Sequence, residues 1–238
     1  MLFISPPFGN YLTFLPHTIP IHGSYTVEPR PGLISQIIKT LHYSTIHQGW
    51  INKIGLRNYG IDYGIAKYKP NSVLSLAILN NNDTEIFSRK ILKDTNIEIN
   101  ISCPNADVKV PEDMKNLLNE ERKWCIVKLS PTDTNECIDN LYQMGFRQFH
   151  CCNTYPLTLG GLSGPILIPY VTQKINYIKR KYKDCEIIAG GGIQNIDALN
   201  YYRNLGADHF SVSSICFNPF RFAWFYFNYL KGRPLQPP

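Results

Sequence analysis

Short apolar runs rich in isoleucine, valine and leucine alternate along this chain with longer segments of mixed polarity. Runs of this kind are typical of buried β-strands, and the longer segments are typical of surface helices. The pattern predicts eight strands, over residues 2–4, 18–21, 73–79, 97–101, 125–129, 148–152, 186–189 and 209–212. It predicts helices near residues 84–93, 112–122, 134–144, 169–182 and 196–205, and a terminal helix over the aromatic-rich segment 217–230.

Residues that favour helix ends flank two of the predicted helices. Asp133 or Thr134 can cap the first of them through a side-chain oxygen, and Gly145 follows its last turn. Asn195 can cap the second, and Gly206 follows it. These boundaries support the alternation of strand and helix in the second half of the chain.

Eight strands with about seven crossovers in 238 residues are the expected content of a single α/β domain folded as a (β/α)8 TIM barrel. An open doubly wound sheet explains fewer strands and needs a linker that the sequence does not show. We therefore expect one domain over residues 1–238, with residues 231–238 as a C-terminal tail. The first crossover, residues 5–17, contains three prolines, so its helix is expected to be very short or absent.

Composition limits the partners of the protein. Hydrophobic content of 44% and charged content of 18% are ordinary for a folded domain. The net charge of +6 comes from scattered lysines and arginines, with the densest run at residues 179–183. Because no nucleic-acid-binding module accompanies them, we expect no nucleic-acid partner, only mild attraction for anionic ligands.

The cysteines and the apolar runs indicate a location. Seven cysteines without regular spacing or CxxC pairs favour reduced thiols in a cytoplasmic protein. Cys151 and Cys152 are neighbours on a strand and face opposite ways, so no metal site is expected. No apolar run approaches the ~20 residues that span a bilayer, and no secretory leader is evident, so no membrane contact is expected. We expect the aromatic segment 217–230 to pack on the body of the protein, with a subunit interface as the next interpretation.

Candidate chemistry gathers where the predicted strands end. The strand over 97–101 leads into Ser102-Cys103-Pro104-Asn105, so a thiol lies between Asn100 and Asn105. Lys128 lies within an apolar strand, where its ammonium needs an anion or acceptor. Asn153 and Thr154 follow the next strand. In α/β barrels, the carboxyl ends of the strands carry the active site.

Three loops rich in glycine and serine follow the last predicted strands. Their sequences are Leu-Gly-Gly-Leu-Ser-Gly over 159–164, Ala-Gly-Gly-Gly-Ile over 189–193 and Ser-Val-Ser-Ser over 211–214. Glycine lets backbone N–H groups approach a ligand closely, and barrels often bind phosphate at this position. Together with the lysine and the asparagines, the loops predict a phosphorylated cofactor with a substrate stacked on it.

The chain resembles the dihydroorotate dehydrogenase family of barrels that use flavin mononucleotide (FMN). The motifs that carry the resemblance are the segments 26–32, 51–58, 100–105, 127–129, 153–154, 160–164, 190–193 and 206–208, and they cover roughly residues 19–225. The resemblance implies oxidation of dihydroorotate to orotate in pyrimidine biosynthesis. It also implies the branch with a cysteine base, which is soluble and uses no quinone.

Residue roles follow from the resemblance, motif by motif. Cys103 is implied as the base that removes a proton from the ring carbon, and Lys128 as the cation beside the flavin ring. The implied substrate-binding residues are Asn52, Gly55, Leu56, Asn100, Asn105, Asn153 and Thr154. The implied FMN-binding residues are Ser24, Asn100, Lys128, Ser163, Gly164, Gly191, Gly192, Ser213 and Ser214.

The chain departs from the family pattern near its beginning. The family has a lysine near the first or second strand, whereas no lysine occurs here before Lys39, and His22 is expected to be packed or solvated. Two alternatives therefore stay open: an FMN oxidoreductase acting on another cyclic amide or pyrimidine, and a non-catalytic barrel that binds a phosphorylated ligand. Fumarate suits the soluble branch as electron acceptor, and a nicotinamide acceptor needs an iron–sulfur partner. The resemblance also favours a homodimer.

Overall fold

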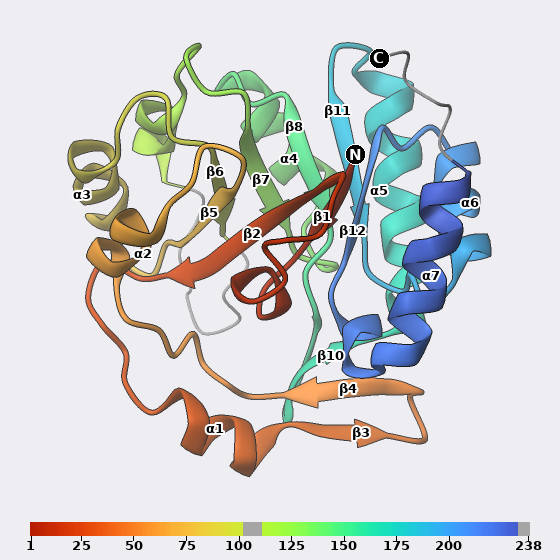
Figure 1. Ribbon diagram of the computed structural model, residues 1–238. Coiled ribbons are helices and arrows are strands. Elements are labelled where there is room, and N and C mark those ends of the chain that lie inside the picture. Colours follow the sequence, from red (N-terminus) through yellow and green to blue (C-terminus); the bar gives the residue numbers. More distant parts are fainter. Residues whose placement is uncertain (102–110, 233–238) are drawn as a thin grey trace.

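Eight parallel strands close into a barrel in the computed structural model, which describes residues 1–101 and 111–232 (Figure 1). The strands follow one another around the barrel in the order β1-β12-β11-β8-β7-β6-β5-β2. Their bounds are β1 Leu2–Ile4, β2 Thr18–Tyr25, β5 Val73–Ala77, β6 Ile97–Asn100, β7 Cys125–Leu129, β8 Gln148–Cys151, β11 Glu186–Gly190 and β12 His209–Val212. All eight strands predicted from the apolar pattern are thus confirmed, and so is the barrel.

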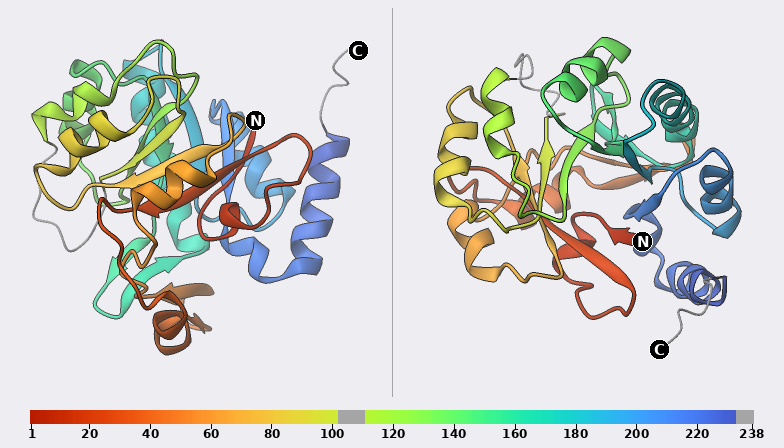
Figure 2. Two further views of the ribbon diagram at one scale, coloured as in Figure 1. Left: turned by 60° about the vertical axis from the view of Figure 1, so that its left-hand side comes forward. Right: turned by 90° about the horizontal axis from the view of Figure 1, so that it is seen from above.

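Helices cover the outside of the barrel (Figure 2). They are α2 Ile61–Lys67, α3 Asp83–Lys90, α4 Asn135–Gln143, α5 Ile168–Lys181, α6 Ile196–Asn204 and α7 Pro219–Lys231. Thr134 and Asn195 cap α4 and α6, as predicted. The predicted helix over 112–122 is wrong in type and length, because η2 is a 3-10 helix over Glu112–Leu117.

The first crossover contains no α-helix, which confirms the expectation of an abbreviated connection. Between β1 and β2 lies only the 3-10 helix η1, Phe8–Asn10. The side chain of Asn10 accepts the N–H of Gly23 at 2.9 Å and donates to its C=O at 3.4 Å. The short connection therefore binds directly to the end of β2.

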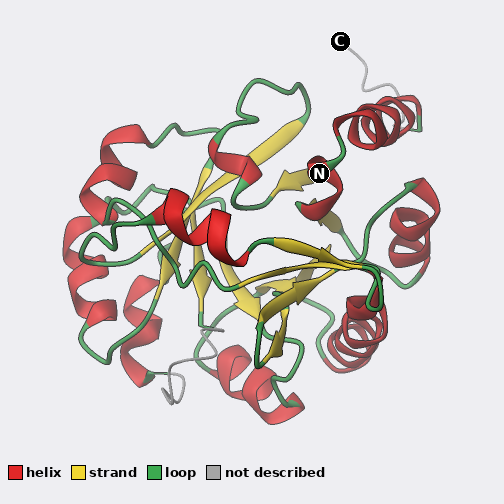
Figure 3. Ribbon diagram, turned by 90° about the horizontal axis from the view of Figure 1, so that it is seen from below, coloured by secondary structure: helices red, strands yellow, loops and turns green. Residues whose placement is uncertain are grey.

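A second, antiparallel sheet lies beyond the carboxyl ends of the barrel strands, and the sequence pattern did not predict it. Its order is β3-β4-β10-β9, with bounds β3 His42–Ser44, β4 Gly49–Asn52, β9 Tyr155–Leu157 and β10 Gly160–Ser163. Helix α1, Leu33–Thr40, packs beside β4. In Figure 3, α1 and this sheet lie in front of the barrel. The sheet therefore joins two distant parts of the chain over one end of the barrel.

The inside of the barrel divides into an apolar floor and a polar upper part. The floor is a cluster of buried residues from the beginnings of the strands, Phe3, Ile19, Ile21, Val73, Trp124, Ile126 and Ile188. Two residues further along β5, β7 and β11, the same face carries Ser75, Lys128 and Gly190. Ser75 and Lys128 therefore lie toward the end where the candidate residues were predicted.

Helix α7 packs on the body of the protein through Phe222, Phe225 and Tyr229, as expected for the aromatic segment. Its opposite face exposes Phe220, Trp224 and Phe227. None of the helices in the described ranges is long and apolar enough to cross a bilayer.

We predict that Asn10→Ala lowers the free energy of unfolding by about 1–2 kcal/mol, because it leaves the backbone polar groups of Gly23 without their partner. Urea denaturation measures this change. Asn71 is exposed just before β5, and Asn71→Ala is the control, with an expected change below about 0.5 kcal/mol. Equal unfolding midpoints for Asn10→Ala and the unmodified protein would contradict the role of Asn10.

Candidate active site

The ends of β6, β7 and β8 bring together residues that the sequence placed far apart. Asn100 lies opposite Lys128 in the barrel register, and Lys128 lies opposite His150. The Nδ2 of Asn153 donates to Asn100 Oδ1 at 3.2 Å, and the N–H of Thr154 donates to Asn153 Oδ1 at 2.9 Å. Two of the residues predicted for the site, Asn100 and Asn153, are therefore hydrogen-bonded neighbours.

Ser24 joins the same group from β2. Asn100 Nδ2 donates to Ser24 Oγ at 3.1 Å, and Ser24 Oγ lies 2.7 Å from Ser75 Oγ on β5. The structure thus brings together Ser24, Asn100, Asn153 and Thr154, four of the residues predicted for the site.

Lys128 finds its anion in Glu98, a residue that the sequence reasoning missed. Lys128 Nζ lies 3.7 Å from Glu98 Oε1, and Glu98 is fully buried. Ser75 donates to Oε1 at 2.8 Å, and His150 Nδ1 lies 2.6 Å from Oε2. The available signal was a glutamate inside the apolar run 97–101 and a lysine inside the next, equally apolar strand.

The charges of this group follow from its burial. Burial alone raises the pKa of Glu98, but the nearby Lys128 and His150 outweigh it and hold the pKa at about 2. Burial lowers the pKa of His150 below its ordinary value, although Glu98 opposes the shift. At neutral pH Glu98 is therefore ionised and His150 is neutral, with its Nδ1–H donated to the carboxylate.

Glycines of two loops meet at the beginning of α5. Gly191 and Gly192 have φ values of +102° and +79°, and a Cβ on Gly192 would lie 2.5 Å from Ile168 Cγ1 and 3.4 Å from the carbonyl oxygen of Gly164. Only glycine allows this backbone conformation with so close an approach. The 190–193 loop and Gly164 are thus neighbours, as the prediction of an anion site requires.

Serines from the last strand end border this region. Ser214 Oγ is hydrogen-bonded to Gln194 Nε2 at 3.1 Å, which ties it to the loop after β11. Ser213 Oγ donates to Pro6 O at 2.9 Å, and Ser163 Oγ donates to Trp50 O at 3.2 Å. Ser213 and Ser163 thus give their hydroxyl hydrogens to backbone carbonyls, whereas Ser214 accepts from Gln194 and can still donate. The hydroxyl of Ser214 and the backbone N–H groups of the loops are a donor set that fits a phosphate.

The second sheet positions Asn52 beside the barrel end. Asn52 on β4 pairs with Gly161 on β10, and a Cβ on Gly161 would lie 2.3 Å from Thr154 Oγ1. Position 161 is a glycine because a larger side chain would collide with Thr154. Since Asn52 pairs with Gly161, the sheet also brings Asn52 close to Thr154.

Gly55 and Leu56 lie in the loop after β4, both with positive φ values. The carbonyl oxygen of Gly55 accepts from Arg30 Nε at 3.2 Å, and that of Leu56 accepts from Asn58 Nδ2 at 2.7 Å. Asn58 also accepts the N–H of Gly60 at 2.7 Å. Asn58, which was not predicted, thus holds the loop that carries two predicted substrate contacts.

His22 does not replace the missing lysine. It follows Ile21, which belongs to the interior cluster of the barrel, so its side chain faces outward from β2. Burial and the nearby Lys69 lower its pKa, which favours the neutral imidazole. The expectation of a packed histidine is confirmed.

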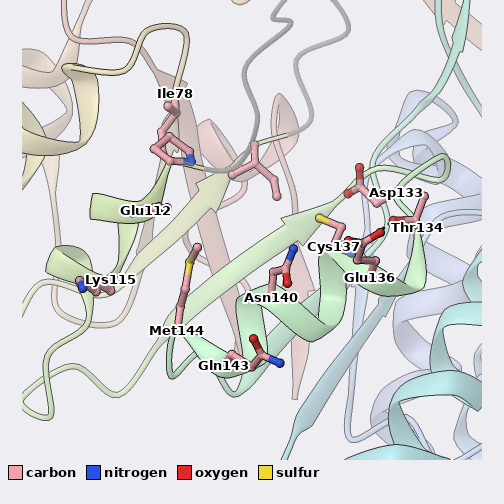
Figure 4. A pocket seen from close by; sticks show the side chains of 12 residues that line it. Ile78, Glu112, Lys115, Asp133, Thr134, Glu136, Cys137, Asn140, Gln143 and Met144 are labelled. Carbon is pink, nitrogen blue, oxygen red and sulfur yellow. Dashed lines mark hydrogen bonds between the residues drawn. The ribbon is translucent and has the colours of Figure 1, made fainter.

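Cys103 and Asn105 lie outside the described residues, so their predicted roles stay predictions. A groove of about 870 Å³ lies between η2 and α4, lined by residues that include Glu112, Lys115 and Asn140 (Figure 4). Among the predicted site residues that the structure describes, none lines this groove. The described residues of the candidate site therefore do not contribute to this groove.

The fold and the polar groups define a class first: a (β/α)8 barrel with its chemistry at the carboxyl ends of the strands, as in barrel enzymes. Residues 18–219 match the family model described as dihydroorotate dehydrogenase. The chain therefore belongs to the dihydroorotate dehydrogenase family.

Individual relatives agree with this assignment. The chain is 26% identical to the catalytic subunit of dihydroorotate dehydrogenase B (NAD(+)) of Thermotoga petrophila, over 91% of this chain and 93% of that protein. It is 31% identical to the same subunit of Staphylococcus carnosus, over 72% of this chain and 68% of that protein. The ligand-free dihydroorotate dehydrogenase of Eimeria tenella has the same fold, with a TM-score of 0.68 over 89% of this chain and 76% of that one, at 18% identity.

We predict that Glu98 makes the protein sensitive to acid. In the folded state its pKa is about 2, below the ordinary value of 4.5, so its stabilising contribution is present above pH 4.5 and is lost as the pH falls toward 2. In this window the free energy of unfolding should fall more steeply for the unmodified protein than for Glu98→Gln, by up to about 1.4 kcal/mol per pH unit.

Denaturant unfolding at several pH values between 5 and 3 measures both slopes. Glu85→Gln is the control, because Glu85 pairs with Arg89 at the surface and should leave the slope unchanged. Parallel curves for Glu98→Gln and the unmodified protein would show that Glu98 is not the group responsible.

Proposed function

We propose that this protein oxidises dihydroorotate to orotate with FMN as its cofactor, as a step of pyrimidine biosynthesis. The main support for the proposal is that three groups of residues lie at the same end of the barrel. The buried Lys128–Glu98 pair, the Asn100–Asn153 pair and the Gly164–Gly192 neighbourhood all lie at the carboxyl end of one barrel. Family membership supports the same assignment.

The proposal of a flavin site is based on hydrogen-bond donors. Backbone and hydroxyl donors at the ends of the last strands suit a phosphate and a polyol, and Lys128 suits the electron-rich edge of a flavin ring. Bound FMN would supply a hydride acceptor. The residues proposed to hold it are Ser24, Asn100, Lys128, Ser163, Gly164, Gly191, Gly192, Ser213 and Ser214.

The substrate half rests on amides. Asn100 and Asn153 present one donor–acceptor group each, and Asn52 and Thr154 approach from the second sheet. Such groups suit a ring with alternating N–H and C=O groups and a carboxylate. Asn105, Gly55 and Leu56 are proposed to add contacts, and Cys103 is proposed to accept the proton from the ring carbon.

The names of the relatives bear on the electron acceptor and on the assembly. The two curated relatives named above are NAD(+) enzymes and are called catalytic subunits, which favours nicotinamide over fumarate and a further subunit over a single-chain enzyme. A homodimer and a cytoplasmic location stay predictions from the sequence.

A second candidate keeps FMN and changes the substrate to another cyclic amide or pyrimidine. The outward orientation of His22 favours it, since His22 does not replace the lysine that the family has near the start of the barrel. A substrate without a carboxylate would not need that cation.

The first test is spectroscopic. Purified protein reconstituted with FMN should be yellow, and dihydroorotate added without oxygen should bleach the flavin absorbance. Bleaching by another cyclic amide but not by dihydroorotate would favour the second candidate. Protein that remains colourless in the presence of added FMN would exclude both.

Cys103→Ala is expected to keep the yellow colour and to slow the bleaching by at least about 100-fold, because the proton lacks its acceptor. Anaerobic stopped-flow absorbance measures the rate. Cys137→Ala, on α4 outside the candidate site, should reduce at the rate of the unmodified protein. A parent-like rate for Cys103→Ala would rule out the thiol as the base.

A further inference from the structure

Glu98 receives its partners from three neighbouring strands. Its carboxylate is fully buried on β6 and accepts the hydroxyl hydrogen of Ser75 on β5 at 2.8 Å. His150 on β8 lies 2.6 Å from the other oxygen, and Lys128 on β7 lies 3.7 Å from the first. With this set of partners the carboxylate is ionised, and an ionised carboxylate only accepts hydrogen bonds.

This restriction determines the direction of the neighbouring hydrogen bonds. Ser75 has one hydroxyl hydrogen and gives it to Glu98, so Ser75 must accept in its 2.7 Å bond with Ser24. The hydroxyl hydrogen of Ser24 is then donated to Ser75, and Ser24 can only accept from its other neighbours. Asn100 must therefore present its Nδ2, not its Oδ1, to Ser24 at 3.1 Å.

The same direction continues to the next asparagine. With Nδ2 on Ser24, Asn100 presents Oδ1 to Asn153, which donates through its own Nδ2 at 3.2 Å. Asn153 Oδ1 then accepts the N–H of Thr154 at 2.9 Å. The two ends of an asparagine amide are otherwise nearly interchangeable. Here the bonds from Thr154 to Ser75 all donate toward the Glu98 carboxylate, with a backbone N–H that can only donate at the other end.

We propose that Glu98 is a positioning residue that acts through Ser75 and Ser24, together with the N–H of Thr154 at the other end, to fix which amide atoms Asn100 and Asn153 offer to a bound ligand. A ring with N–H and C=O groups binds only if donors meet acceptors, so the carboxylate selects the pattern of the ligand without touching it. The proposal rests on the proposed function, in which these amides hold the substrate ring.

Ser75→Ala tests the proposal, because it breaks the chain at Glu98 and leaves the Glu98–Lys128 pair in place. In the FMN-loaded protein, the dissociation constant of orotate, read from perturbation of the flavin absorbance, should rise about tenfold. The dissociation constant of FMN, read from flavin fluorescence, should rise less than that of orotate, because the proposed FMN contacts other than Ser24 and Asn100 lie outside this chain. Ser75→Thr keeps a hydroxyl and should restore orotate binding.

Ser211→Ala is the matched control. Ser211 is also a buried serine inside the barrel, but its hydroxyl bonds to Ser5 at 2.7 Å and belongs to no part of the chain from Glu98. Orotate affinity should stay unchanged in this variant. Unchanged affinity in Ser75→Ala, or an equal loss in Ser211→Ala, would overturn the proposal.

A second measurement needs no cofactor and separates this proposal from the proposed function. In apoprotein labelled with ¹⁵N-asparagine, the side-chain NH₂ signals of Asn100 and Asn153 should move in Ser75→Ala and not in Ser211→Ala. If the unmodified protein does not bind FMN, the proposed function fails, and these signals still decide the proposal. If Ser75→Ala does not fold, Ser24→Ala breaks the chain one bond further out, and unmoved signals there would overturn it.

Discussion

A carboxylate that is wholly removed from water must be surrounded by cations and donors, and this requirement organises the inside of the barrel. Glu98 obtains its partners from β5, β7 and β8, so three strands must keep their register for one charge to be tolerated. Of these partners, Lys128 is a residue of the candidate site and Ser75 lies one hydrogen bond from Ser24 in that site. Stability and the geometry of the site therefore depend on the same contacts.

The barrel and the second sheet each position a different part of the candidate site. The barrel strands supply the residues of the inner network, and the second sheet brings β4 and β10 across from distant parts of the chain. The connection between β1 and β2 is a 3-10 helix, and its Asn10 binds the backbone of Gly23. The next residue of β2, Ser24, is hydrogen-bonded to Asn100 in the network. A small number of side-chain-to-backbone bonds replaces the packing that a longer connection would give.

The strands could be predicted from sequence because each is an apolar run buried on both faces, which gives a strong and local signal. The second sheet could not, because β9 and β10 are short, half-buried and rich in glycine, and their pairing with β4 is not local. Lys128, Asn100 and Asn153 were identified from their places at strand ends. Glu98 was missed because its role depends on hydrogen-bond and charge partners more than 20 residues away in the sequence. A single acidic residue in a strand has no sequence signature of its own.

The three tryptophans lie in three different environments, and this gives each part of the fold its own optical signal. Trp124 is buried in the floor cluster against Phe3, Trp50 stacks on Phe217 at the second sheet, and Trp224 is largely exposed on α7. Emission from Trp124 responds to opening of the floor, whereas Trp224 is already in contact with water in the native state. A blue-shifted component that outlasts the Trp50 signal during denaturation would mark a species in which the barrel persists after the sheet has separated.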